Sequence, residues 1–253
     1  MPQSALIEAC VDSIDSAIEA ELGGAERIEL CGELLQGGVT PSAGLIGAVW
    51  ERIDVALFVL IRPRTGDFLY STDERDVMLR DIALARSLDV DGVVLGALTA
   101  QGDIDVELMR VLIDAARPMQ VTFHRAFDFA RDQDAAIDAL MQLGVDRVLT
   151  SGGAATALEG TASLAGLVQR TANAMTVLAG GSITASNVAQ VVRESGVREV
   201  HVRGAMRVES GMSYRRRSVT LSRPQPLGDY ERVVTQAAEM ARVVGAARQE
   251  LRS

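Results

Sequence analysis

The residues of this sequence that could do chemistry are few, and several occur where a β-strand is expected to end. The chain has two cysteines, Cys10 and Cys31, and two histidines, His124 and His201. Each lies at the end of a short apolar run of strand type. Thiolates and imidazoles bind soft or borderline metals, and imidazole is also an acid or base near neutral pH. Metal binding and acid–base catalysis are therefore both open.

Two carboxylates accompany the cysteines. Glu8 and Glu29 each precede a cysteine by two residues, so each shares a face of its strand with that cysteine. Inward carboxylates on adjacent strands raise one another's pKa, which suits general acid–base catalysis. The alternative is that they pair with Arg62 and Arg125 in a buried ionic network. If the protein is an enzyme, the expected catalytic residues are Glu8, Glu29, Arg62 and His124.

Three segments have the composition of anion-binding loops. Arg62 and Arg64 offer two guanidinium groups after one expected strand, and two glycine pairs follow later strands. Glycines allow backbone amides to approach a phosphate, although tight turns alone also explain them. The residues expected to bind an anion are Arg62, Arg64, Ser151, Gly152, Gly180, Gly181 and Arg203.

A recurring pattern predicts the elements that position these residues. The pattern is a glycine or aspartate, a small apolar residue and then a β-branched strand. Its four copies start at Gly24, Asp89, Gly144 and Gly196, at spacings of 65, 55 and 52 residues. A period near 55 is two βα units, so four copies predict eight strands. The segments between strands have helical periodicity. The pattern favours a (β/α)₈ TIM barrel, whose functional site lies at the C-terminal ends of its strands.

The expected domain organisation is a single TIM-barrel domain over residues 1–253. The barrel should occupy about residues 4–203. An irregular wrapping segment over 204–227 and a final amphipathic helix over 230–251 should follow it. No composition shift marks a linker.

Composition excludes several classes of function. All 25 basic residues are arginine, which excludes Schiff-base, pyridoxal-phosphate and Walker-A chemistry because each needs a lysine amine. The net charge of −9 argues against nucleic acid as a partner. No apolar run is long enough to span a membrane, and acidic residues stand where a secretory signal would be apolar. Two cysteines are too few for a disulfide framework, so we expect a cytoplasmic protein.

Several strings resemble the CutC family, which is named for copper homeostasis. They are Arg27–Ser42, Ile61–Phe68, Val121–Asp128, Arg147–Gly152, Leu178–Gly181 and Glu199–His201. The resemblance implies a cytosolic TIM barrel, usually oligomeric, that binds Cu(I) through Cys10 and Cys31. Two positions depart from the family pattern: Leu69 replaces a third cysteine, and Val202-Arg203-Gly204 replaces small residues after His201.

Two functions therefore remain open. The first is Cu(I) binding by Cys10 and Cys31, to which His124 and His201 could add imidazole ligands. The second is an enzyme that performs acid–base chemistry on a phosphorylated or otherwise anionic small molecule. The expected partners are a copper ion or a small anion and a second copy of the chain, most simply in a dimer. We expect Glu8, Glu29, Arg62, His124 and His201 to share one cavity.

Overall fold

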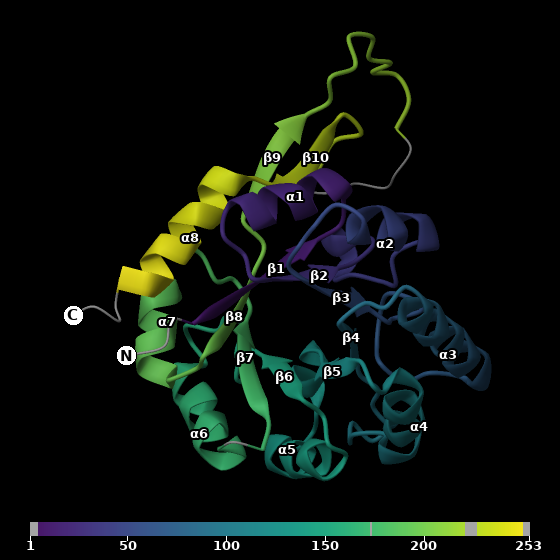
Figure 1. Cartoon of the computed structure of the whole chain (residues 1–253), viewed down its shortest axis with the longest axis vertical. Helices are drawn as coiled ribbons and strands as arrows, with labels where there is room; N and C mark the ends of the chain where they lie inside the picture. Colours follow the sequence, from purple (N-terminus) through teal and green to yellow (C-terminus); the bar gives the residue numbers. More distant parts are fainter. Residues whose placement is uncertain (1–4, 173, 221–226, 250–253) are drawn as a thin grey trace.

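Eight parallel strands close into a barrel in the computed structural model, which describes residues 5–172, 174–220 and 227–249 (Figure 1). Each strand pairs with its neighbours in sequence, and β8 closes the ring on β1. The strands are β1 (Leu6–Val11), β2 (Arg27–Leu30), β3 (Ala56–Leu60), β4 (Gly92–Leu95), β5 (Gln120–Phe123), β6 (Arg147–Thr150), β7 (Thr176–Gly180) and β8 (Glu199–Val202). The predicted TIM barrel is confirmed.

Helices surround the barrel and connect its strands (Figure 1). They are α1 (Ile14–Leu22), α2 (Ala43–Trp50), α3 (Thr72–Ser87), α4 (Val106–Ala116), α5 (Gln133–Gln142), α6 (Thr161–Thr171) and α7 (Val188–Ser195), with 3₁₀ turns η1 (Leu34–Gln36) and η2 (Arg125–Phe129). Side-chain caps begin several of them. At α3, Ser71 and Glu74 form a reciprocal capping box that satisfies amides at the helix start.

Alternation along each strand separates two environments. On β1 and β2, Ile7 and Ile28 point outward and pack under the helices, as members of the large hydrophobic core. The opposite parity points into the barrel. There Cys10 and Cys31 belong to a second, smaller apolar cluster with Phe58. The inward face therefore carries the polar and thiol groups, as the sequence predicts.

The chain beyond β8 forms a projecting arm and a last helix. Strands β9 (Ala205–Glu209) and β10 (Glu231–Thr235) pair as an antiparallel ribbon that extends away from the barrel (Figure 1). The sequence did not indicate these strands: β9 lies within the expected irregular segment, and β10 lies where the final helix was expected to begin. Residues 221–226 lie outside the described residues. Helix α8 (Ala237–Gln249) packs on α1 and α7. It begins later than predicted, and Leu251, its expected end, also lies outside the described residues.

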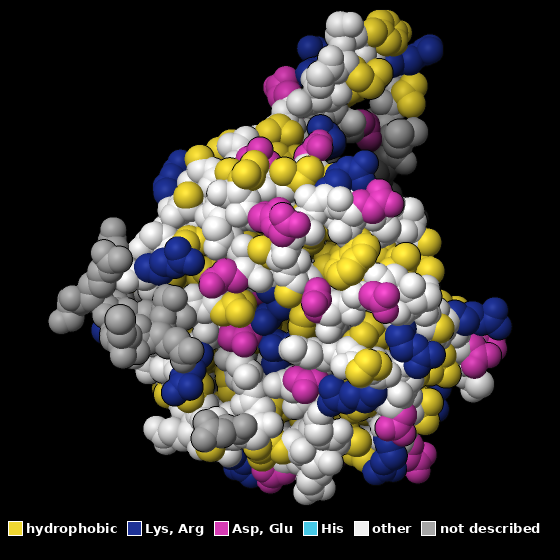
Figure 2. Space-filling view, viewed as in Figure 1, with side chains coloured by type: hydrophobic (Ala, Val, Ile, Leu, Met, Phe, Trp, Pro, Cys, Tyr) yellow, Lys and Arg dark blue, Asp and Glu magenta, His cyan; other side chains and the backbone are white. Residues whose placement is uncertain are grey.

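The surface is mixed in character. In Figure 2 charged and apolar side chains are interspersed over the barrel, and apolar side chains gather on the projecting arm. Met212 and Tyr214 on this arm are exposed. No described helix is both long and apolar enough to cross a bilayer.

Candidate functional site

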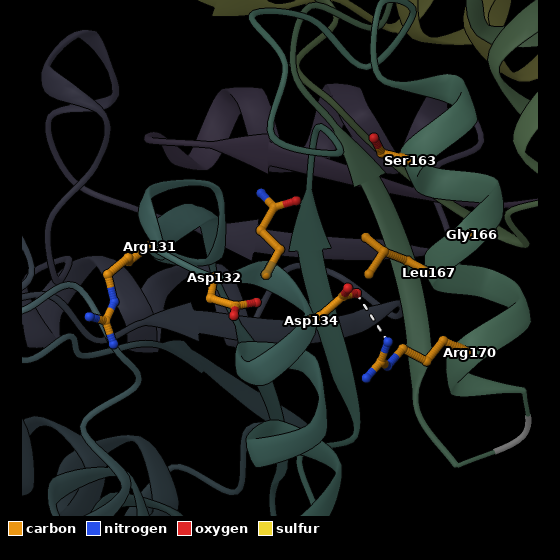
Figure 3. A pocket seen from close by; sticks show the side chains of 8 residues that line it. Arg131, Asp132, Asp134, Ser163, Gly166, Leu167 and Arg170 are labelled. Carbon is orange, nitrogen blue, oxygen red and sulfur yellow. Dashed lines mark hydrogen bonds and ion pairs between the residues drawn. The ribbon is translucent and has the colours of Figure 1, made fainter.

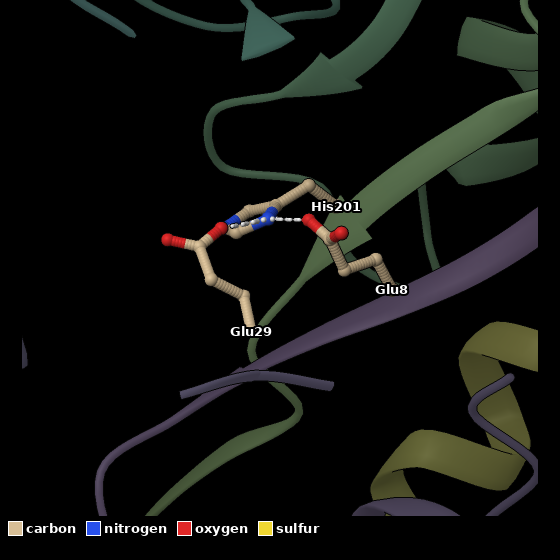
Figure 4. A group of neighbouring side chains, drawn as sticks. All are labelled: Glu8, Glu29 and His201. Atoms are coloured by element: carbon tan, nitrogen blue, oxygen red, sulfur yellow. Dashed lines mark hydrogen bonds and ion pairs between the residues drawn. The ribbon is translucent and has the colours of Figure 1, made fainter. Parts of the chain in front are cut away.

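Three adjoining strands bring Glu8, Glu29 and His201 together inside the barrel (Figure 4). The Nδ1 atom of His201 lies 2.7 Å from Oε1 of Glu8 and forms a hydrogen bond with it. The same nitrogen lies 3.3 Å from Oε2 of Glu29, but that oxygen has no hydrogen-bond partner. The one imidazole is therefore fixed by Glu8 and faces a second carboxyl group, whose nearer oxygen accepts no hydrogen bond.

An ionic layer supports this cluster from the N-terminal side of the barrel. Arg27 donates from Nε to Glu8 Oε2 at 2.5 Å and also bonds to Glu199, which accepts from Arg147 Nε at 3.0 Å. Both guanidinium groups lie over the Phe58 ring, with centroid distances of 5.0 and 5.2 Å. Glu8 thus pairs with Arg27, and neither Arg62 nor Arg125 takes that place. Sequence reasoning missed Arg27, although it has the same strand parity as Glu29 and Cys31.

The three groups of the cluster hold different charges. Burial would raise the pKa of Glu8, but Arg27 and the His201 hydrogen bond outweigh it and lower the pKa to about 2. Burial raises the pKa of Glu29 to about 8 despite the attraction of His201. Burial alone would lower the pKa of His201, but Glu29, Cys10 and Glu8 hold it well above the usual value. Glu8 is therefore ionised at neutral pH, whereas Glu29 and His201 hold a proton more tightly than a free carboxyl group and a free imidazole do.

The two cysteines form a thiol pair beside this cluster. Both are free and buried, on neighbouring strands. A hydrogen bond from Cys31 lowers the pKa of Cys10 to about 5 against the effect of burial, and the same bond raises the pKa of Cys31 well above the usual value. Cys31 Sγ also lies 3.5 Å from Glu29 Oε1. The pair accordingly carries one thiolate and one thiol.

Arg62 and His124 belong to a second group around Phe68. The Arg62 guanidinium lies 5.1 Å from the Phe68 ring, and the His124 ring lies 4.9 Å from it. Burial and the Arg62 charge lower the pKa of His124 to about 3, so the imidazole is neutral. Its Nδ1 accepts the Ala126 amide at 3.2 Å, which leaves the proton on Nε2. Gly96 makes room for this ring, since a Cβ there would lie 2.7 Å from it.

Two of the other expected anion-binding groups, Arg64 and Arg203, have carboxylate partners. Arg64 donates to Glu74 at 2.5 Å and to Asp67 at 3.0 Å, within its own loop. Arg203 lies 3.7 Å from Asp12. A Cβ on Gly180 would lie 2.5 Å from Leu149, so this glycine permits close packing.

A carboxylate of the protein occupies the glycine loop after β6. Asp128 accepts from the Ser151 amide at 3.2 Å and from the Gly153 amide at 3.1 Å, and from Thr150 Oγ1 at 2.5 Å. The Gly152 amide donates to Thr150 Oγ1 at 2.9 Å. These amides, which could bind a phosphate in another loop, are therefore satisfied internally. Asp128 was not among the expected site residues.

Two cavities lie away from the cysteines and histidines. One of about 890 Å³ lies between α5 and α6, where Arg170 bonds to Asp134 across the groove (Figure 3). The other, of about 710 Å³, is lined by residues at the N-terminal ends of β6, β7 and β8, including Glu199. Neither is lined by the cysteines or histidines.

Similarity to known proteins agrees with the resemblance noted in the sequence. The profile described as "CutC family" matches residues 5–206. A mouse protein named "Copper homeostasis protein cutC homolog" is 45% identical over 235 residues, which cover 93% of this chain and 86% of that protein. A Bacteroides fragilis protein named as a member of the family is 44% identical over 231 residues, 91% of this chain and 92% of its own length.

A solved structure extends the similarity to three dimensions. The putative copper homeostasis protein CutC from Streptococcus agalactiae superposes with a TM-score of 0.75 at 33% sequence identity, covering 78% of this chain and 97% of that one. The family profile matches the barrel, and the alignments with the two relatives cover nearly the whole chain. The chain therefore belongs to the CutC family.

Proposed function

We propose that this protein acts in copper homeostasis by binding Cu(I) between Cys10 and Cys31. The observation that carries the proposal is the placement of two free, buried cysteines in one apolar cluster, at the ends of the adjacent strands β1 and β2. Cu(I) is a soft ion that prefers thiolate ligands. Its binding would displace the Cys31 proton and leave the net charge of the buried pair unchanged. The copper homeostasis proteins named above support the same reading.

The donor set favours coordination by the two sulfurs alone. The pKa of His201 is held well above its usual value, so both of its ring nitrogens carry a hydrogen at neutral pH, and His124 lies in the separate group around Phe68. The carboxylates of Glu8 and Glu29 are hard ligands that match Cu(I) poorly. We accordingly do not include either imidazole in the proposed site.

Competition with a chromophoric Cu(I) chelator tests this function. Cys10→Ser and Cys31→Ser should each lower Cu(I) affinity by orders of magnitude, because each removes one of two ligands. Glu29→Gln is the matched control, since it changes a group beside the thiols without removing a sulfur. A Cys variant with the wild-type affinity would refute the proposal.

The cellular setting is part of the proposal. Two free cysteines fit the cytosol, where thiols stay reduced. We also propose a homo-oligomer, most simply a dimer, supported by the exposed apolar side chains Met212 and Tyr214 on the projecting arm. Light scattering of the purified protein tests this; a monomeric mass at micromolar concentration would contradict it.

One observation favours a second candidate function, an acid–base enzyme. Glu29 presents an unpaired carboxyl oxygen beside an imidazolium that Glu8 holds in place. Such a pair can donate and accept protons near neutral pH. Glu29→Gln should then abolish turnover of a small-molecule substrate while Cys10→Ser retains it, which is the reverse of the pattern for copper binding.

A further inference from the structure

Arg62 carries a buried positive charge with no carboxylate partner among the described residues. It is 6% exposed, and its Nη atoms donate to the carbonyls of Gly37 at 3.2 Å, Gly38 at 2.7 Å and Gly66 at 2.6 Å. Carbonyl groups orient a guanidinium but do not neutralise it. Buried charges in proteins are normally paired with an opposite charge. The structure around Arg62 thus lacks a counter-charge.

A second buried donor lies beside the same Phe68 ring. His124 is also 6% exposed, and its Nε2 atom has no hydrogen-bond partner. Because Nδ1 accepts the Ala126 amide, Nε2 carries the hydrogen and can only donate. The Nε atom of Arg62 is likewise buried and unpartnered. Two such donors close to one aromatic ring are exceptional, because buried polar atoms are nearly always satisfied.

We propose that Arg62 and His124 bind the carboxylate of a small organic ligand beside Phe68. The Nε–H of Arg62 is free, and Nη2 uses only one bond, to Gly66. The Nε–Nη2 edge of a guanidinium pairs with the two oxygens of a carboxylate. His124 Nε2–H is a further donor in the same group.

The charges favour a monoanion over a phosphate. His124 is neutral, so Arg62 supplies a single positive charge. Arg64, the other cation of this loop, is already paired with Glu74 and Asp67. Asp128 occupies the amides of the glycine loop after β6, which a phosphate would otherwise use. A carboxylate would thus neutralise the charge of Arg62 without needing any group that already has a partner in the protein.

This proposal rests on the second candidate function, the acid–base enzyme, and names the class of ligand that such an enzyme would bind. Binding of the ligand itself requires neither turnover nor copper. Benzoate is a suitable probe because its ring can pack on Phe68. The chain has only two histidines, so the imidazole NMR signals of His124 can be assigned with a His124→Gln variant. Titrations with benzoate and with inorganic phosphate, at constant pH and ionic strength, compare the two anion classes directly.

Benzoate should shift the His124 imidazole signals saturably, with a Kd in the millimolar range, and phosphate should not. Arg62→Gln should weaken benzoate binding about tenfold or more, whereas Arg64→Gln, which removes the neighbouring paired arginine, should bind as the wild type does. Since Arg62 also holds three loop carbonyls, calorimetry on His124→Gln provides a second test. That variant should bind benzoate several-fold more weakly.

Three results would overturn the proposal: no saturable shift in the wild type, equal affinity in Arg62→Gln, or tighter binding of phosphate than of benzoate. If the protein binds benzoate but turns over no carboxylate, the enzymatic function is refuted and the proposed binding site stands. Turnover that depends on Glu29, in a protein that shows no saturable benzoate binding, would remove the site and leave the enzymatic function.

Discussion

Arg27 donates to Glu8 at 2.5 Å on one carboxylate oxygen, while His201 engages the other oxygen at 2.7 Å. This shared carboxylate joins the ionic layer of the barrel to the candidate site. Because Glu8 is fully buried, its charge depends on both partners. The position of His201, and hence its approach to Glu29, follows from this arrangement.

Removing Arg27 should destabilise the fold strongly. Arg27→Met leaves the Glu8 charge without its main partner, and loss of one member of a buried ion pair costs about 3–5 kcal/mol. Denaturant unfolding measures this change. Arg52→Met is the matched control, since Arg52 pairs with Glu51 on the surface and should cost less than about 1 kcal/mol. Equal effects of the two substitutions would contradict the role given to the buried layer.

The stabilisation by Glu8 should depend on pH. Its pKa is lowered to about 2 in the folded protein, against a usual value of 4.5. The unfolded state therefore binds more protons between these values. The stabilisation, of about 3 kcal/mol, should be complete above pH 4.5 and disappear as the pH falls to about 2.

Unfolding of the wild type and of Glu8→Gln across this range provides the measurement. The difference in unfolding free energy between the two proteins should shrink on acidification. A difference that stays constant from neutral pH to about 2 would show that the Glu8 charge does not stabilise the fold.

Asp128 should be essential to the loop after β6. Asp128→Ala leaves the amides of Ser151 and Gly153 and the Thr150 hydroxyl without their acceptor. We expect a loss of about 3 kcal/mol in unfolding free energy. Asp134→Ala, which removes an exposed partner of Arg170, should change it by less than about 1 kcal/mol. A small effect at both positions would show that water or an anion can replace the Asp128 carboxylate.

The thiol pair should titrate asymmetrically. Thiolate absorbance in the ultraviolet should rise through about pH 5 as Cys10 ionises, with one thiolate per chain at neutral pH. Cys10→Ser should abolish this step. Cys31→Ala should move it to higher pH, because it removes the thiol that donates to Cys10. Two thiolates appearing together near pH 9 would contradict the hydrogen-bonded pair.

The fold was predictable because strand alternation and the recurring pattern are local properties of the sequence. The same alternation predicted that Glu8 and Glu29 point inward. It could not identify their partners, because Arg27 and Glu199 are 172 residues apart and meet only when β8 closes on β1. The Asp128 contacts were also missed, since they depend on how η2 packs against β6.

X-ray absorption spectroscopy of the protein loaded with Cu(I) identifies the atoms that bind the copper. We expect two sulfur ligands at about 2.2 Å, close to typical metal–thiolate bond lengths, and no nitrogen or oxygen in the first coordination sphere. The Cys10→Ser and Cys31→Ser proteins should lose this spectrum, and Glu29→Gln should keep it. A spectrum dominated by imidazole nitrogen, or one that persists without either cysteine, would contradict the assignment of copper to this thiol pair.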